Sequence, residues 1–391
     1  MIVTASGSVI GADEKSAMHA AVEKGWLTAG PITEKFEQGL SRFTGIRHVH
    51  AVNSGSSANL VAVATMVEAG IWKAGDEIIT VAASFPTTVN PLLLYGLFPV
   101  FVDIELGTYN AAPETVKAAV TDKTRGVMMA HTLGNPYRLP DLGLPVIEDC
   151  CDALGATVDG VHVGSNAAMA TCSFFPAHHI TTGEGGAVFT NDPRLAGIAE
   201  SVRDWGRDCW CEPGKENTCG KRFSWEWETL PQGFDHKYTY TRLGYNLKLT
   251  EIQAACGNAQ LERLASFVAK RKDNFRYLSG RCAKLAGHLV LPDFAPGASP
   301  FGFPITFRET GLRSQAQQYL SQKGIGSRLL FAGNITRQPY MKDRRYRVHG
   351  ELTNTDKVLA DTLWIGCHPA LSVEHLEYAV QHLETFLGKF E

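Results

Sequence analysis

Short apolar runs alternate with helical patterns along the first 250 residues of the chain. This alternation is typical of strands joined by crossover helices, so it predicts a mostly parallel sheet covered by helices. The predicted strands are 49–53, 77–82, 98–103, 126–131, 146–149, 168–174 and 187–190. In such sheets functional groups gather at the carboxyl ends of the strands.

The most apolar stretch of the chain, residues 77–103, contains Pro86, Pro91 and Pro99 together with several hydroxyl and amide side chains. Proline and polar residues interrupt it too often for a membrane-spanning helix. The pattern therefore predicts two buried strands with a loop between them, in a soluble protein.

After residue 250 the pattern changes to one long helical stretch, residues 250–287, followed by an apolar run at 301–307 and helical patterns at 312–323 and 372–390. This order predicts a large domain over residues 1–250. Residues 251–391 are predicted to form a long linking helix and a smaller C-terminal α/β domain.

Residues 204–245, called the excursion below, have little periodicity and are rich in Trp, Gly, Cys and charged residues. A long irregular segment is usually functional or disordered. Its four tryptophans, Trp205, Trp210, Trp225 and Trp227, favour an ordered insertion within the large domain.

The composition is that of an ordinary globular protein, with 391 residues, 44% hydrophobic and 20% charged. Lys and Arg number 37 against 40 Asp and Glu, a net charge of -3. Near-neutral charge gives no electrostatic case for nucleic acid or an anionic membrane. The first 14 residues lack the features of a secretory signal, so a cytoplasmic location is expected.

Two strand ends carry candidate functional groups. The strand at 49–53 is followed by a Ser- and Gly-rich turn, residues 54–59, and then an apolar helix, which would aim backbone N–H groups at an anion. The strand at 146–149 ends in Asp149. Taken alone, the turn is more typical of a helix N-cap, and the aspartate of a cap or a loop hydrogen bond.

Taken together, segments along nearly the whole chain resemble the sugar aminotransferase and dehydratase family of fold-type I pyridoxal-phosphate enzymes. These segments are 30–37, 53–58, 84–90, 148–149, 173–181, 183–187 and 244–246. The resemblance implies the α/β architecture of that fold type, with a mostly parallel seven-stranded sheet in the large domain.

The resemblance also implies how the cofactor is held. Ser56, Ser57 and Ser173 would bind its phosphate, and Phe85 would stack on its ring. Asp149 would pair with the protonated ring nitrogen, which makes the ring an electron sink. Asn246 would reach the phosphate from the neighbouring subunit, which implies a homodimer.

The chain departs from the aminotransferases of this family at one position. They carry the lysine that tethers the cofactor five residues after the equivalent of Ser173, and here that residue is His178. No lysine occurs between Lys123 and Lys215. The cofactor is therefore expected as pyridoxamine phosphate, or as noncovalent pyridoxal phosphate.

With this histidine the segment 173–186 resembles the 4-keto-6-deoxysugar 3-dehydrases. The resemblance implies that His178 removes a proton from the cofactor while the sugar loses its C3 hydroxyl, since an imidazole titrates near neutrality. His179 is expected to be a packing or hydrogen-bonding neighbour. The alternatives are a catalytically silent binding protein and a conventional aminotransferase.

Four of the nine cysteines separate two branches of these dehydrases. The branch with a [2Fe–2S] cluster has cysteine gaps of 57, 1 and 7 residues, which Cys151, Cys209, Cys211 and Cys219 match. Thiolates are the ligands such clusters use. Zinc is the alternative metal, and the neighbouring Cys150 is an alternative ligand to Cys151. A cluster-independent 3-dehydratase is the alternative enzyme.

The predicted function is C3 dehydration of an NDP-4-keto-6-deoxyhexose, with CDP-4-keto-6-deoxyglucose as the specific candidate. The resemblance implies a flavin-containing iron–sulfur reductase as partner, supplying electrons from NADH. It also places residues 327–337 near the nucleotide sugar, where Arg328 or Arg337 could meet the diphosphate. Taken singly, either arginine is more typical of a surface residue.

Overall fold

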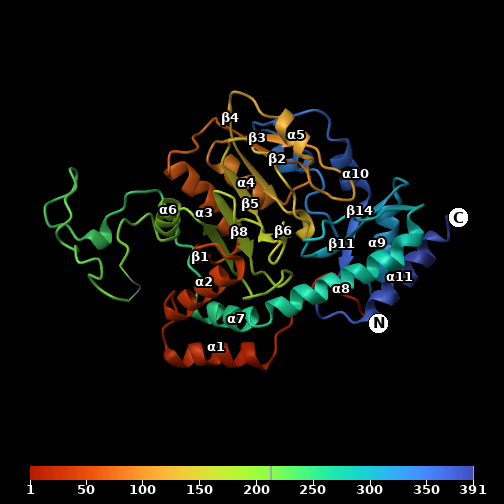
Figure 1. Ribbon diagram of the computed structural model, residues 1–391, viewed down its shortest axis with the longest axis horizontal. Coiled ribbons are helices and arrows are strands. Elements are labelled where there is room, and N and C mark those ends of the chain that lie inside the picture. Colours follow the sequence, from red (N-terminus) through yellow and green to blue (C-terminus); the bar gives the residue numbers. More distant parts are fainter. Residues whose placement is uncertain (212–213, 391) are drawn as a thin grey trace.

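The computed structural model of the protein describes residues 1–211 and 214–390. It is built around two sheets with helices packed against them (Figure 1). Among the residues that it describes, no helix has both the length and the apolar character that a bilayer crossing needs.

The larger sheet has eight strands in the order β1-β9-β8-β5-β4-β2-β3-β13. In this sheet β9 runs antiparallel to β1 and β8, and the other neighbouring strands pair in parallel. The strands are β1 (His48–Val52), β2 (Glu77–Val81), β3 (Phe98–Val102), β4 (Thr124–Ala130), β5 (Val146–Asp149), β8 (Met169–Ser173), β9 (Gly186–Thr190) and β13 (Arg347–Val348). All seven predicted strands are present, and the α/β fold prediction is confirmed.

The eighth strand, β13, was not predicted. It has two residues and comes from the C-terminal part of the chain, where it pairs in parallel with β3. The predicted loop between β2 and β3 was wrong, because residues Pro86–Leu94 form the helix α4. Pro86 occupies the first turn, where a missing N–H has no helical partner to lose, although Pro91 lies inside the helix.

Alternate residues of the central strands face opposite layers. On β9, Ala187 and Phe189 pack into an apolar cluster with residues of α2, α7 and α8, whereas Val188 packs with α3 and α6. The helices that accompany this sheet are α1 (Ala12–Lys24), α2 (Pro31–Thr44), α3 (Gly55–Glu68), α4, α5 (Pro113–Ala118), α6 (Pro193–Arg203) and α7 (Glu251–Leu261), with 3-10 turns η1 (Thr132–Gly134) and η2 (His236–Tyr238). The two-stranded hairpin β6 (Thr157–Val158) and β7 (Val161–His162) stands apart.

The smaller sheet is antiparallel, in the order β10-β11-β14-β12, and has its own apolar core. Its strands are β10 (Leu289–Val290), β11 (Gly302–Phe307), β12 (Ser327–Leu329) and β14 (Thr362–Gly366), and its helices are α8 (Leu264–Cys282), α9 (Leu312–Gln322), α10 (Thr353–Asp361) and α11 (Val373–Leu387). Three further 3-10 turns are η3 (Ala283–Leu285), η4 (Ile335–Arg337) and η5 (Pro339–Met341). Val3 bridges to Ile325, so the N-terminus also packs here.

Candidate active site

A buried polar network surrounds Asp149 at the carboxyl end of β5. One carboxylate oxygen, Oδ2, accepts hydrogen bonds from Asn59 Nδ2 at 2.8 Å and from Thr88 Oγ1 at 2.7 Å. The other, Oδ1, accepts from the backbone N–H of Cys151 at 3.1 Å. Asn59 is itself fixed by Thr171, whose hydroxyl donates to its Oδ1 at 2.6 Å. The carboxylate is thus held in one orientation by groups from α3, α4 and β8.

The N-terminus of α3 lies against the ends of β8 and β9. Ser54 caps this helix by accepting the N–H of Ser57 at 3.0 Å, and Ser56 is exposed. Gly186 permits the close approach, because a Cβ there would stand 2.4 Å from the carbonyl oxygen of Ser54. Ser173 lies beside Gly55. This arrangement presents free N–H groups and hydroxyls, which suits a phosphate.

His178 lies in the loop between β8 and β9, and Arg271 of α8 holds that loop. The Arg271 side chain is fully buried and donates to the carbonyl oxygens of Ala177 and His178 at 3.1 and 2.9 Å. It also donates to the backbone carbonyl oxygen of Phe301 at 2.9 Å, and the ring of Phe301 lies 5.1 Å from the imidazole of His178. The backbone position of His178 is therefore fixed by a helix distant in sequence.

The imidazole of His178 faces a buried carboxylate. His178 Nδ1 lies 3.3 Å from Asp152 Oδ1, and the two side chains are 14% and 10% exposed. At this distance the contact is an ion pair when the imidazole is protonated, with imperfect hydrogen-bond alignment. Burial raises the pKa of Asp152, although His178 acts in the opposite direction. The pair resembles a general base with its orienting acid.

The neighbouring His179 has a different environment. It is 2% exposed, and its Nε2 lies 3.0 Å from the carbonyl oxygen of Ser299. Burial, with the charge of Arg271, lowers the pKa of His179 well below its usual value. A neutral buried imidazole held by a backbone carbonyl is suited to packing, as the sequence predicted for this residue.

Phe85 precedes α4 by one residue and is 50% exposed. It lies at the end of α4 that carries Thr88, three residues before this threonine, which bonds to Asp149. Phe331 approaches it edge-on at 6.1 Å and brings residues 327–337 to the site. In that segment Arg337 is paired with Asp356, whereas Arg328 is exposed.

Asn246 is exposed, directly after the excursion. The next residue, Leu247, accepts the N–H of Asn53 at 2.8 Å, so this segment passes the end of β1. Of the residues predicted to hold the cofactor, Asp149, Ser173 and the α3 turn come together within one chain. Asn246 forms a backbone bridge with Asp204, and its contact with the cofactor of a neighbouring subunit stays a prediction.

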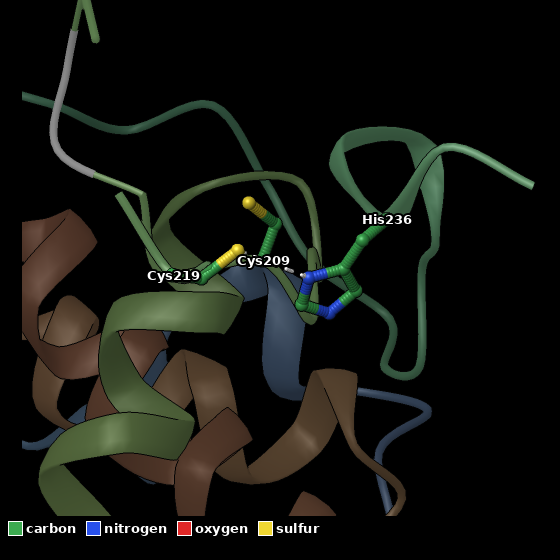
Figure 2. A group of neighbouring side chains, drawn as sticks. All are labelled: Cys209, Cys219 and His236. Carbon is green, nitrogen blue, oxygen red and sulfur yellow. Dashed lines mark hydrogen bonds between the residues drawn. The ribbon is translucent and has the colours of Figure 1, made fainter. Parts of the chain in front are cut away.

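Three of the four predicted metal ligands meet in the excursion. Cys209, Cys211 and Cys219 line one cavity together with His236. Single ligand atoms of Cys209, Cys219 and His236 all lie within 4.8 Å of one another, and Figure 2 shows these side chains turned toward one another. Burial opposes ionisation of Cys211, but hydrogen bonds from Cys219 and others outweigh it and lower the pKa to about 7. Thiolate is the metal-binding form.

Cys151 lies elsewhere. It follows β5 by two residues, and its thiol would be 3.1 Å from a Cβ built on Gly55, beside Ser173. Cys150 points instead into the apolar core, at 4% exposure. Between these two cysteines, Cys151 is therefore the one whose thiol faces the α3 turn. Within the described part of one chain it does not join the other three thiols.

Sequence reasoning missed several residues of this site: Asn59, Thr88, Asp152, Arg271 and His236. Asp152 had one available signal, because it is a second acid three residues beyond a strand-end acid. The others act through partners that are tens of residues away, for example 61 positions between Thr88 and Asp149. No local spacing identifies such contacts.

The fold and the site are those of an enzyme with the pyridoxal-phosphate aminotransferase fold. The sheet is mostly parallel, an aspartate ends one of its strands, a helix N-terminus suited to a phosphate lies beside that aspartate, and an aromatic residue flanks them. Comparison with known proteins agrees. The sequence matches the family described as "DegT/DnrJ/EryC1/StrS aminotransferase family" over residues 8–384. The chain belongs to this family.

Two relatives are similar over nearly the whole chain. The lipopolysaccharide biosynthesis protein RfbH of Salmonella typhimurium is 52% identical, covering 99% of this chain and 92% of the relative. The dTDP-4-dehydro-2,6-dideoxy-D-glucose 3-dehydratase of Saccharopolyspora spinosa is 46% identical, covering 98% and 86%. Among solved structures, Escherichia coli GDP-4-keto-6-deoxy-D-mannose-3-dehydratase with bound hydrated PLP has a TM-score of 0.88 at 27% identity, covering 98% and 100%.

Proposed function

We propose that the protein is a pyridoxamine-phosphate-dependent 3-dehydratase of an NDP-4-keto-6-deoxyhexose. The observation that carries this proposal is His178, which occupies the tether position and faces the buried carboxylate of Asp152. The absence of any lysine between Lys123 and Lys215 supports it. Two relatives named as 3-dehydratases of nucleotide sugars point to the same reaction class.

The donor set fits this cofactor at both ends. Asp149 is positioned to pair with a protonated ring nitrogen, and its oxygens are already aligned by three donors. Ser56, Ser57 and Ser173 would hold the phosphate at the start of α3, and Phe85 would cover the ring. When bound, pyridoxamine phosphate supplies a free amine that condenses with the sugar C4 ketone and a ring that accepts electrons.

In this proposal His178 is the catalytic base. It removes the proton from the cofactor carbon C4′ as the C3 hydroxyl of the sugar leaves. Asp152 holds the imidazole in one orientation and compensates the positive charge that it gains, as the third member of a catalytic triad does. Arg271 fixes the backbone of the loop, so that the His178 imidazole is directed at the cofactor carbon C4′.

Loss of the hydroxyl as water must be balanced by two electrons and two protons if the product is a 3-deoxy-4-ketosugar. We assign the electrons to a [2Fe–2S] cluster and a flavin-containing iron–sulfur reductase that oxidises NADH. The support is the spacing of Cys151, Cys209, Cys211 and Cys219 and the meeting of three of these thiols in the excursion. Thiolates match the softness of iron in such clusters.

The specific substrate proposed is CDP-4-keto-6-deoxyglucose. The names of the relatives carry dTDP and GDP sugars, so the nucleotide is a point to be tested. Turnover of a panel of CDP, dTDP and GDP 4-keto-6-deoxysugars, with the reductase and NADH present, measures it directly. Preference for a nucleotide other than cytidine contradicts the CDP assignment.

The test of the catalytic role uses His178→Asn and His178→Lys, with His19→Asn on the exposed face of α1 as the matched control. Exchange of the C4′ proton of pyridoxamine phosphate is measured in the presence of substrate. We expect His178→Asn to lose about 10²- to 10⁴-fold in exchange rate, the usual contribution of a positioned base. His178→Lys is expected to trap the cofactor covalently, as borohydride reduction would reveal, and to dehydrate poorly.

Parent-like exchange by His178→Asn would show that another group is the base. No exchange by the parent enzyme, with any sugar of the panel, would instead favour a silent binding protein. Iron and acid-labile sulfide analysis of anaerobically purified protein separates the cluster-dependent enzyme from a cluster-independent dehydratase. Zinc alone at the cysteines contradicts the cluster.

A further inference from the structure

The excursion begins at the end of α6 and projects away from the body of the molecule (Figure 1). Its three thiols line one cavity with His236, and aromatic rings pack around that histidine. His236 is fully buried, stacks on Trp225 at 4.3 Å and has Trp210 at its edge at 5.6 Å. The excursion is therefore ordered around the thiols without any contact from Cys151.

The excursion buries little of itself. Within its described residues only Gly206, His236 and Thr239 are buried. Its exposed large side chains include Trp205, Trp210, Phe223, Tyr238, Tyr240 and Leu243, which are between 41% and 75% exposed. An exposed apolar set of this size marks an interaction surface.

Exposed apolar side chains also flank the candidate active site on the body. Phe175 follows Ser173 by two residues and is 48% exposed, and Phe85 is 50% exposed. Cys151 lies beside Ser173 and is part-exposed. The body therefore offers an apolar surface with one thiol, and the excursion offers an apolar surface with three.

We propose that these two surfaces meet in a symmetric dimer, so that each metal centre takes Cys209, Cys211 and Cys219 from one chain and Cys151 of the partner subunit. This proposal rests on the proposed function, which requires four thiolates for the cluster. A two-fold axis makes the contact reciprocal: if the excursion of one chain reaches its partner's site, the partner's excursion reaches the first site.

The sequence following the excursion supports this placement. Leu247 and Lys248 pass the end of β1 at Asn53 and Val52, directly before the α3 turn. The base of the excursion is thus anchored at the rim of its own site, while the thiols are carried away from that rim. In the proposed dimer the fourth thiol comes from the second copy, so this base keeps its contacts.

His236 is the rival for the fourth ligand, since it lies within 4.8 Å of two thiols in the same chain. Its Nε2 is occupied by Asp208 at 2.8 Å, and its Nδ1 faces Cys219 Sγ at 4.0 Å. Because Nε2–H donates to Asp208, a neutral imidazole presents an unprotonated Nδ1 toward Cys219, which is the arrangement of a metal-ligating histidine. We assign the fourth position to Cys151 on the spacing of the four cysteines, and ligation by His236 is the outcome that the Cys151→Ser homodimer tests.

Mixed dimers test the proposal. Chains carrying Cys151→Ser and Cys211→Ser, each with its own affinity tag, are co-expressed, and the dimer that holds both tags is purified anaerobically. Iron, acid-labile sulfide, visible absorption and electron paramagnetic resonance are the readouts. The matched control is Cys256→Ser, a thiol of α7 that donates to the Thr181 carbonyl at 3.4 Å, a bond that serine can keep.

We expect both homodimeric variants to lose the cluster and the mixed dimer to keep half of the parent's iron and sulfide. In the mixed dimer one centre lacks two thiols, and the other is complete. No cluster in the mixed dimer would overturn the proposal in favour of a centre within one chain. Full iron in the Cys151→Ser homodimer would also overturn it, in favour of His236 as ligand.

Two checks keep these outcomes interpretable. Thermal unfolding and size-exclusion chromatography establish that each variant folds and dimerises, and Cys151→Ala replaces Cys151→Ser if the latter does not. A parent protein that is monomeric overturns the sharing of ligands. A parent dimer that takes up no iron contradicts the cluster itself, and so the proposed function, whereas a loaded parent with an empty mixed dimer contradicts only the sharing.

Discussion

Replacing Asp152 by asparagine removes a charge from the candidate site while keeping the size of the side chain. Asp152 Oδ1 lies 3.3 Å from His178 Nδ1. In the proposed reaction the imidazole takes up a proton, and the carboxylate both orients the ring and compensates its charge. The substitution therefore affects the reacting state more than substrate binding.

The expected decrease in kcat follows from the free energy of the contact that the substitution removes and from the contacts that remain. Because the His178–Asp152 contact has imperfect hydrogen-bond alignment, the most that it can contribute is the value of a hydrogen bond to a charged group, about 1.5–3 kcal/mol. At about 1.36 kcal/mol per factor of ten, this corresponds to a decrease in kcat of roughly 10- to 160-fold. A larger loss is not expected, because the Phe301 ring contact at 5.1 Å and the Arg271 hold on the loop stay in place.

The same substitution is expected to stabilise the fold at neutral pH. Burial raises the pKa of Asp152 above its ordinary value of 3.8. For an acid with a raised folded-state pKa, stability is fully present below the unfolded-state value and is lost as the pH rises through the folded-state value. Asparagine has no charge to bury, so the free energy of unfolding of the variant exceeds that of the parent by an amount that grows from pH 4 to pH 7.

Steady-state kinetics and urea unfolding at both pH values measure these effects. Asp159→Asn is the matched control, because its carboxylate is 72% exposed and pairs with Arg138 at the surface. A parent-like kcat for Asp152→Asn would refute the orienting role. A change confined to KM would do the same, since it would place Asp152 in binding. A lower free energy of unfolding for Asp152→Asn than for the parent at pH 7 would refute the inference that burying the charged Asp152 carboxylate destabilises the fold.

Three stability predictions concern backbone and buried groups outside the reaction. Gly134→Ala should cost at least about 3 kcal/mol in urea unfolding, because φ is +83° and a Cβ would stand 1.9 Å from the Ser299 carbonyl oxygen. Gly280→Ala, in open space within α8, should instead stabilise by about 0.5–1 kcal/mol, and a loss there would contradict the reasoning. Glu251→Gln should cost about 3 kcal/mol, because the buried carboxylate accepts three backbone N–H groups and one hydroxyl at the start of α2. The exposed Glu34→Gln is its control, and equal effects of the two substitutions would rule out this account.

The strands of the large sheet could be predicted because each is a short apolar run bounded by polar residues. β13 could not, because its two residues, Arg347–Val348, have no apolar pattern and become a strand only through pairing with β3. α4 was missed because its two prolines, Pro86 and Pro91, mask its helical pattern. The helix forms where Thr88 can bond to Asp149, a contact that lies outside any local sequence window.

The candidate site divides in the same way. Asp149, the α3 turn and the His178 position are readable, because each sits at a fixed offset from a strand end. The partners that fix them come from other elements: Asn59 and Thr171 for Asp149, and Arg271 for the loop. Their roles depend on tertiary packing, which brings together residues that the sequence separates.

Exchanging a tethering lysine for histidine changes what the rest of the site must do. A tethered cofactor is fixed at its reactive carbon as well as at its two ends, whereas a free amine leaves only the ends to hold it. Both ends are correspondingly stiff here. Three donors lock Asp149, and Gly186 lets the α3 turn press against the sheet. In the proposed reaction such preorganisation would let the His178 imidazole act on one carbon, since a displacement of about 1 Å is enough to cost on the order of 10²-fold in rate.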